Sequence, residues 1–241
     1  MINVQREAEI PASLSTDQVK KYLSDLALYL QDKENNTEPK KPPYRNWDVL
    51  EAFDRCFYSK CYLTETKKEN SWGLEIDHFI PQNERPDLVH EWTNLFPCEH
   101  STNKLRTRRT PEGGYLNPTV IEDDVESMIL YSADFQFENI SFTPADHSDP
   151  KTKNTCELLE RVHNGHDALS KMTTANLRAE IRYRANEILK EFDLWRNADE
   201  DSDQKQEYKD TLKRFLSRKS SFTMLMRSMP LVQKYCTAFF D

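Results

Sequence analysis

The stretch LEIDHFIP at residues 74–81, followed by WTNLFP at residues 92–97, decides the fold of the central part of the chain. Apolar and polar residues alternate through the first segment, which predicts a strand that ends at Pro81. A second short strand is expected over residues 92–96. A helix should follow over about residues 98–109, because a proline and two glycines come directly after it. The predicted order is strand, loop, strand, helix.

On both sides of this unit, the spacing of apolar residues predicts helices. They are expected over residues 15–31, 47–56, 175–195 and 208–216. Residues 32–46 contain three prolines and no apolar period, so a linker or surface loop is expected there. The predicted fold class is α+β and mostly helical, with a small ββα core, N-terminal helices and a C-terminal helical region.

The chain is long enough for a small core domain with helical additions. We expect an N-terminal helix and linker over residues 1–45, the ββα core over residues 46–115, and a helical region with possible partner docking over residues 116–241. The tail over residues 222–240 is the candidate docking surface, although such an apolar stripe is more often core. Its apolar residues include Phe222, Met224, Leu225, Met226, Met229, Phe239 and Phe240.

The composition indicates a folded, soluble and cytoplasmic protein. Of the 241 residues, 31% are charged, but an aromatic content of 11% argues against a disordered chain. No apolar run is long enough to cross a bilayer, and the first residues lack the basic and apolar segments of a signal peptide. Five cysteines, an odd number spread over the chain, indicate reduced thiols or a metal site rather than a disulfide framework.

The formal net charge of -8 is unevenly distributed. Residues 121–150 hold eight acidic residues and no Lys or Arg, whereas residues 101–110 hold four basic residues and no acidic one. The local field matters more than the total when a charged ligand docks. We expect the basic segment to bind phosphate backbones, and the acidic segment to face elsewhere or to meet a basic partner surface. The four basic residues are Lys104, Arg106, Arg108 and Arg109.

Three residues are suited to the hydrolysis of a phosphodiester bond. The His78 imidazole can take a proton from water near neutral pH. A hard divalent cation, Mg²⁺ or Mn²⁺, could neutralise the phosphate if Asp77 and Asn103 supply oxygen ligands. Strict alternation along a strand sends Asp77 and His78 to opposite faces. Both can reach one phosphate only if the strand ends or twists at this point.

This arrangement resembles the HNH nuclease family, whose ββα-metal fold has a histidine on the first strand, an asparagine in the connection and a histidine or asparagine on the helix. Those positions correspond here to His78, Asn94 and Asn103. The Asp-His-x-x-Pro motif and the nine-residue step from Asn94 to Asn103 also match the family pattern. The resemblance implies a water activated by His78 and one divalent ion on Asp77 and Asn103. It also implies that Asn94 ties the loop together by hydrogen bonds, and that the substrate is nucleic acid, with DNA favoured over RNA.

Many HNH relatives bracket this core with two Cys-x-x-Cys pairs that bind a structural zinc. In this chain the first pair is reduced to Cys61 and Thr64, and the second region offers Cys98 and His100. Together with Cys56, the cysteines and His100 could in principle form a site, but their spacing is irregular. Buried thiols and a surface histidine are the ordinary interpretation, so we expect no structural zinc.

The likeness extends beyond the nuclease motif. The opening MINVQR, the segment KCYL at residues 60–63 and the segment TCELL at residues 155–159 resemble the HNH subunit of Septu-type antiphage defence systems, including versions attached to retrons. The resemblance implies an effector nuclease that acts with an ATPase subunit. Composition and spacing do not indicate that partner.

Two other functions remain open at this point. The ββα unit could be a non-catalytic scaffold or binding module. A site that has lost its activity would, however, be expected to lack at least one of Asp77, His78 and Asn103. A stand-alone restriction-type endonuclease is the other alternative. It would require a recognisable specificity domain, and the acidic stretch at residues 121–150 argues weakly against one.

Overall fold

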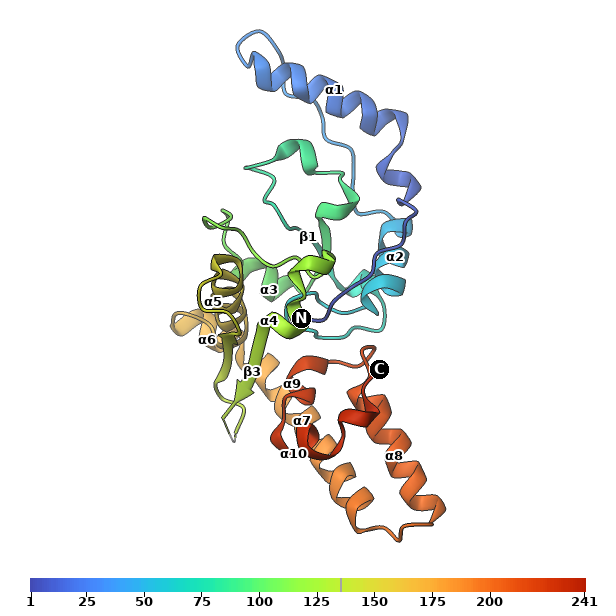
Figure 1. Cartoon of the computed structure of the whole chain (residues 1–241). Helices are drawn as coiled ribbons and strands as arrows, with labels where there is room; N and C mark the ends of the chain where they lie inside the picture. The colour runs from blue at the N-terminus through green and yellow to red at the C-terminus, as the bar shows by residue number, and fades with distance from the viewer. Residues whose placement is uncertain (135) are drawn as a thin grey trace.

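The computed structural model describes residues 1–134 and 136–241. These residues form mostly helices, together with two antiparallel sheets of two strands each, so the prediction of a mostly helical α+β fold is confirmed. Figure 1 shows an elongated molecule, with α1 (Asp17–Gln31) at one end and α7 (Ala175–Asn197) and α8 (Asp203–Leu216) at the other. The two small sheets lie between these ends. None of the described helices is both long enough and apolar enough to cross a membrane.

The N-terminal helices form where the apolar spacing places them. The side chain of Thr16 caps α1 by accepting a hydrogen bond from the Val19 amide. α1 packs through Tyr22 and Leu26 against Val89, in a small cluster separate from the main core. Helix α2 (Trp47–Phe57) lies in the main core and buries one face completely. The fully buried side chains of that face include Val49, Leu50 and Phe53.

The central unit has the predicted order but shorter elements. Strand β1 (Glu75–His78) pairs with β2 (Leu95–Cys98), and α3 (His100–Leu105) follows. The second strand was predicted to begin at residue 92, which is wrong, because Trp92–Asn94 is a turn of 3₁₀ helix, η4. Pro97 is tolerated in β2 because a two-stranded sheet has only edge strands.

Helix α3 also ends earlier than the predicted residue 109. Arg106 adopts an extended backbone conformation, with φ of -67° and ψ of 145°. Its guanidinium is buried and donates to the backbone carbonyls of His78 and Phe79 at the end of β1. Arg106 and the residues that it contacts are far apart in the sequence, so no local pattern indicates where the helix ends.

The region after the ββα unit contains a hairpin that we did not predict. Strands β3 (Ile129–Ala133) and β4 (Ile140–Pro144) pair in an antiparallel sheet after the short helix α4 (Val125–Met128). Helix α5 (Pro150–Asn164) packs against β4, and α6 (Ala168–Thr173) leads into α7. The buried residues of the hairpin alternate with exposed ones, which is the ordinary pattern of a half-buried sheet: Ile129, Tyr131, Ile140 and Phe142.

The C-terminal tail belongs to the core. It forms α9 (Thr223–Arg227) and α10 (Pro230–Tyr235), followed by a 3₁₀ turn, η6 (Thr237–Phe239). Four residues of the expected docking stripe are buried, and the other three are half-buried and packed on the same core. No residue of that stripe is therefore fully exposed, although Leu231 and Tyr235 of the same tail are exposed. The buried four are Phe222, Leu225, Met226 and Met229.

The ββα unit and the C-terminal helices share this core. The buried carboxylate of Glu65 binds the Lys60 ammonium at 3.2 Å and accepts a hydrogen bond from the Thr223 amide at 3.0 Å. Burial would raise the pKa of Glu65, but the neighbouring ammonium groups lower it to about 2. An ionised carboxylate thus ties α9 to the segment that precedes β1. Four further 3₁₀ turns complete the described elements: η1 (Ala12–Leu14), η2 (Ser71–Gly73), η3 (Pro86–Leu88) and η5 (Ile121–Asp123).

Candidate active site

The imidazole of His78 is buried and has a polar partner at each ring nitrogen. Its Nε2 lies 3.1 Å from the Val89 carbonyl oxygen, and its Nδ1 lies 3.0 Å from the side-chain amide nitrogen of Gln82. A carbonyl only accepts and an amide NH₂ only donates, so the proton sits on Nε2 and a lone pair is presented at Nδ1. Burial lowers the pKa of His78 to about 4, against the opposing effect of the bond to Val89. The ring is therefore neutral at pH 7, as a general base requires.

The linker between α1 and α2 covers this histidine. The ring of Tyr44 meets the His78 imidazole edge-on, with the ring centroids 4.8 Å apart. The ammonium of Lys41 lies 2.5 Å from the Gln82 side-chain oxygen, which turns the amide nitrogen towards His78. None of these three contributions was predicted from the sequence. Gln82 directly follows the Asp-His-x-x-Pro motif and could have been suspected, whereas nothing in the sequence relates the linker to His78.

The carboxylate of Asp77 has two side-chain partners on one oxygen. Its Oδ2 accepts a hydrogen bond from the Tyr62 hydroxyl at 2.6 Å and forms an ion pair with Arg106. Burial raises the pKa of Asp77, and the contacts with Arg106 and Tyr62 oppose the rise. Because both side-chain contacts involve Oδ2, Oδ1 is the oxygen that could ligate a cation.

Asn103 lies on α3, and its side chain is hydrogen-bonded to Glu75 of β1. The Asn103 side-chain nitrogen donates to Glu75 Oε2 at 2.9 Å, and His100 pairs with the other carboxylate oxygen. Partial burial would raise the pKa of Glu75, but the hydrogen bonds from Asn103 and His100 hold it below its ordinary value. Because the nitrogen of the Asn103 amide faces Glu75, the oxygen of the same amide points away from Glu75.

Asp77, His78 and Asn103 line one open cavity of about 530 Å³. Because β1 ends at His78, the two neighbouring side chains reach the same hollow despite the alternation of a strand. Oxygen atoms of Asp77 and Asn103 suit Mg²⁺ or Mn²⁺, with water and substrate oxygens completing the coordination. The donor set therefore fits a hard divalent cation. The remaining lining residues are Tyr44, Ile76, Pro81, Gln82, Asn83, Arg106, Thr107 and Arg108.

Asn94 closes the connection between the two strands. Its side-chain oxygen accepts from the Ile80 amide at 2.7 Å, and its nitrogen donates to the carbonyls of Ile80 and Leu88 at 3.1 and 3.2 Å. The residue is 4% exposed, so water cannot replace these bonds. The contacts are those of a positioning residue that holds the loop beside His78.

Replacing Asn94 by alanine should destabilise the fold by about 1–3 kcal/mol, because buried backbone groups of Ile80 and Leu88 lose their partner. Urea unfolding of the variant and of the unchanged chain measures the difference. Asn94→Asp is the matched comparison, since it keeps the acceptor for the Ile80 amide but removes both donors. A loss below about 0.5 kcal/mol for the alanine variant would mean that the loop is held by other contacts.

The four basic residues near α3 do not share one role. The guanidinium of Arg106 is buried against Asp77 and two carbonyls, so we no longer place it on the expected phosphate-binding surface. Lys104, Arg108 and Arg109 are exposed, and Arg108 lines the cavity. Their binding to nucleic acid stays a prediction.

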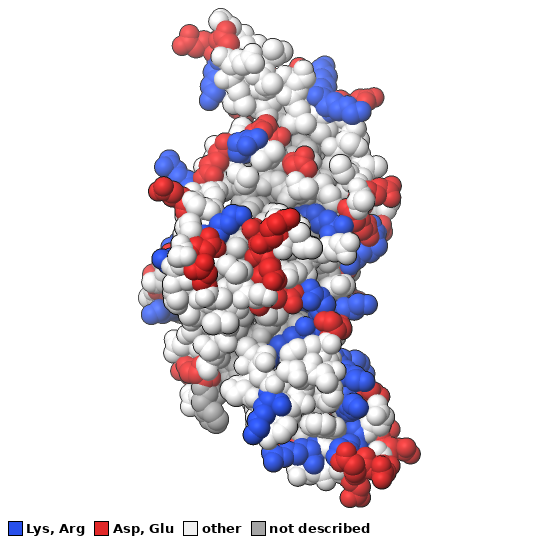
Figure 2. Space-filling model, in the orientation of Figure 1, with Lys and Arg blue, Asp and Glu red and all other residues white. Residues whose placement is uncertain are grey.

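Three acidic residues of the stretch 121–150 bind partners that are distant in the sequence. Asp123 binds Lys151 at 2.8 Å, Glu126 binds Arg218 at 2.6 Å, and Asp124 accepts from the Asn3 side chain at 2.7 Å. Figure 2 shows several acidic side chains grouped near the middle of the drawn face, with basic side chains on either side of them. These three carboxylates help to hold the fold together, whereas Glu122, Asp134, Glu138 and Asp146 of the same stretch are exposed.

The candidate zinc ligands are only partly brought together. The thiol sulfurs of Cys61 and Cys98 lie 4.0 Å apart, and both residues are fully buried. Cys56 lines a different cavity, and His100 pairs with Glu75. No three His, Cys, Asp or Glu residues in the described ranges are clustered as metal ligands. Zinc content stays a question for elemental analysis.

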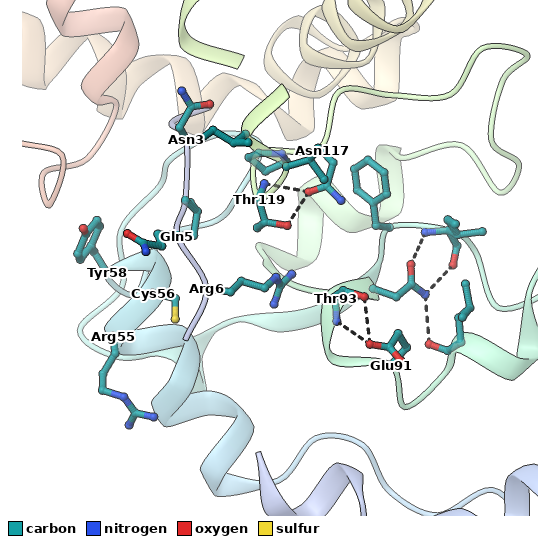
Figure 3. A pocket seen from close by; sticks show the side chains of 18 of the residues that line it. Asn3, Gln5, Arg6, Arg55, Cys56, Tyr58, Glu91, Thr93, Asn117 and Thr119 are labelled. Carbon is teal, nitrogen blue, oxygen red and sulfur yellow. Dashed lines mark hydrogen bonds between the residues drawn. The ribbon is translucent and has the colours of Figure 1, made fainter. Parts of the chain in front are cut away.

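A second and larger cavity, of about 930 Å³, is lined by Asn94 but not by Asp77, His78 or Asn103. Figure 3 shows Arg6 extending from the N-terminal segment into this space, with Glu91 and Thr93 at the neighbouring turn η4. The guanidinium donates to the Leu95 carbonyl at 2.7 Å and lies over the Trp92 ring, 4.6 Å from its centroid. Burial lowers the pKa of Arg6 to about 9. Arg6 thus acts as a packing residue behind the ββα unit.

This chain has a partial similarity to a known protein. The chain is 35% identical over 80 residues to the Septu protein PtuB of Bacillus thuringiensis. The matched part covers 32% of this chain and 30% of PtuB, less than a third of either protein. No protein-family model matches the chain, and no solved structure matches it.

Proposed function

We propose that this chain is a metal-dependent HNH endonuclease that hydrolyses phosphodiester bonds in nucleic acid, with DNA as the favoured substrate. The observation that carries the proposal is the single cavity lined by His78, whose imidazole is neutral, and by Asp77 and Asn103, which offer oxygen donors. The exposed Lys104 and Arg108, on and after α3, add positive charge suited to a phosphate backbone.

The residues divide the chemistry between them. A divalent ion bound at Asp77 and Asn103 would neutralise charge on the scissile phosphate and the departing alkoxide. His78 would accept the proton of the attacking water at Nδ1, where its lone pair is directed. The Gln82 amide donates to that lone pair, so it has to yield the position to water during the reaction.

Cleavage should require Mg²⁺ or Mn²⁺ and stop when the metal is chelated. The test is incubation of the purified chain with supercoiled plasmid and with structured RNA, each with Mg²⁺, with Mn²⁺ and with excess EDTA. The His78→Ala variant, purified in parallel, excludes a contaminating nuclease. Undiminished cleavage in EDTA would show that the proposed reaction is wrong.

A non-catalytic ββα scaffold is the second candidate, favoured by the ion pair between Arg106 and Asp77. A positive charge on the carboxylate competes with a metal cation for the same group. The same assay separates the two, because a scaffold would bind nucleic acid without cleaving it under any metal condition.

We also propose that the chain works as the nuclease of a Septu-type antiphage defence system, together with an ATPase subunit. The support is the partial similarity to the Septu protein PtuB and the motif resemblance at residues 60–63 and 155–159. Co-purification with the product of the neighbouring ATPase gene tests the partnership. Phage plating on cells that carry the gene pair, with and without His78→Ala, tests the defence role.

A further inference from the structure

The carboxylate of Glu75 joins the first strand to the helix of the ββα unit at two points. Oε2 accepts from Asn103, at 2.9 Å, and Oε1 pairs with His100. His100 and Asn103 are three residues apart on α3 and therefore lie on the same face of the helix. Glu75 and Asp77 are two residues apart on β1 and share one face of the strand. One carboxylate thus links the helix to the same strand that carries Asp77.

This contact determines which end of the Asn103 amide faces the cavity. An ionised carboxylate can only accept hydrogen bonds, so the amide nitrogen and not the oxygen must face Glu75. Asn103 lines the cavity, whereas Glu75 does not. The Asn103 oxygen accepts no hydrogen bond from any residue that the structure describes, which leaves its lone pairs available.

Helix α3 has few other means of holding this orientation. It contains six residues, and so short a helix is marginal without tertiary contacts. Glu99 caps its N-terminus by accepting from the Ser101 amide at 3.0 Å, but that contact does not bear on the Asn103 amide. The hydrogen bond to Glu75 is the contact that acts on the amide itself.

We propose that Glu75 is a positioning residue of the metal site, which holds the Asn103 amide so that its oxygen is directed to a divalent cation. The inference rests on the proposed function. Hydrogen-bond partners of this kind typically change metal affinity by about 10–100-fold when they are removed.

The test measures Mn²⁺ binding by the full chain. The electron paramagnetic resonance signal of free Mn²⁺ reports how much of the ion stays unbound. Glu75→Ala should weaken binding by about 10-fold or more. Glu75→Gln should stay close to the unchanged chain, because its amide oxygen can still accept from Asn103. Glu75→Asp keeps the charge but is one methylene shorter, so it should weaken binding as alanine does. Glu51→Ala, which removes an exposed carboxylate on α2, is the matched control.

In cleavage assays, Glu75→Ala should need more metal for half-maximal activity but regain most of the rate at saturating metal. Equal Mn²⁺ affinity in Glu75→Ala, Glu75→Asp and the unchanged chain would overturn this inference but would leave the proposed function standing. A loss in Glu75→Gln as large as in Glu75→Ala would also overturn it, because Glu75 would then be a direct ligand. Absence of Mn²⁺ binding by the unchanged chain would overturn the proposed function, and the inference with it.

Discussion

His78→Ala is expected to lower the rate of cleavage by about 10²–10⁴-fold, because it removes the group that accepts the proton of the attacking water. The residue does not supply a metal ligand in the proposed site, so Mn²⁺ affinity should change little. Initial rates on plasmid DNA at saturating metal, together with the Mn²⁺ titration, separate these two effects. Cleavage at the unchanged rate would exclude His78 as the base.

His90 provides a matched control for this variant. It is also buried, its Nε2 donates to the Pro42 carbonyl oxygen at 3.1 Å, and its ring packs against Tyr44 with ring centroids 6.2 Å apart. It does not line the cavity that contains His78. His90→Ala should therefore disturb packing to a similar degree while cleavage continues. An equal loss of cleavage in both variants would indicate a general effect on the linker.

The low pKa of His78 sets the expected pH profile. Burial lowers this pKa from 6.5 to about 4, and the active form of a base is the neutral one. Cleavage should stay level from roughly pH 8 to pH 6, and decline only as the pH approaches the folded pKa. Burial of the neutral ring stabilises the fold above the ordinary pKa, and this contribution is lost as the pH falls towards about 4. A midpoint near pH 6.5 in the rate profile would contradict this assignment.

Asp77→Ala is expected to destabilise the fold by about 3–5 kcal/mol and to abolish cleavage. The large cost arises because Arg106 would keep its buried positive charge without a carboxylate beside it; the two side chains are 4% and 9% exposed. Urea unfolding measures the loss of stability. A variant as stable as the unchanged chain would mean that Arg106 finds other partners or reaches solvent.

A double variant isolates the contribution of the ion pair. Asp77→Ala combined with Arg106→Met removes both charges and should recover much of the stability lost by Asp77→Ala alone. Asp77→Asn keeps an acceptor for the Tyr62 hydroxyl and for Arg106 but also removes the negative charge, so it should recover only part of the stability lost in Asp77→Ala. Asp77→Asn is accordingly the cleaner variant for measuring metal affinity, because loss of cleavage in Asp77→Ala combines a missing ligand with a weakened fold.

Several elements could be predicted because their signals are local. The 3.6-residue apolar period of α1, α2 and α7 lies within each helix, and the alternation before Pro81 lies within one strand. The order of the ββα unit followed from the same patterns. The alternation in β3 and β4 was also present in the sequence. Each strand is only five residues long, and so short an alternation does not by itself distinguish a strand from a loop.

The candidate site depends both on the local sequence and on the tertiary structure. The sequence by itself determined which residue types were available for the chemistry, and in which order: Asp77, His78, Asn94 and Asn103. It also determined that β1 ends near Pro81, which allows neighbouring side chains to reach one cavity.

Only the tertiary structure decided what each polar group contacts. Arg106 pairs with Asp77 across 29 positions, Lys41 reaches Gln82 across 41, and Glu75 binds Asn103 across 28. Such contacts depend on where packing of the core places separate segments, and no local periodicity encodes that placement. For the same reason, a basic residue next to α3 became a buried ion-pair partner, and an apolar tail became part of the core.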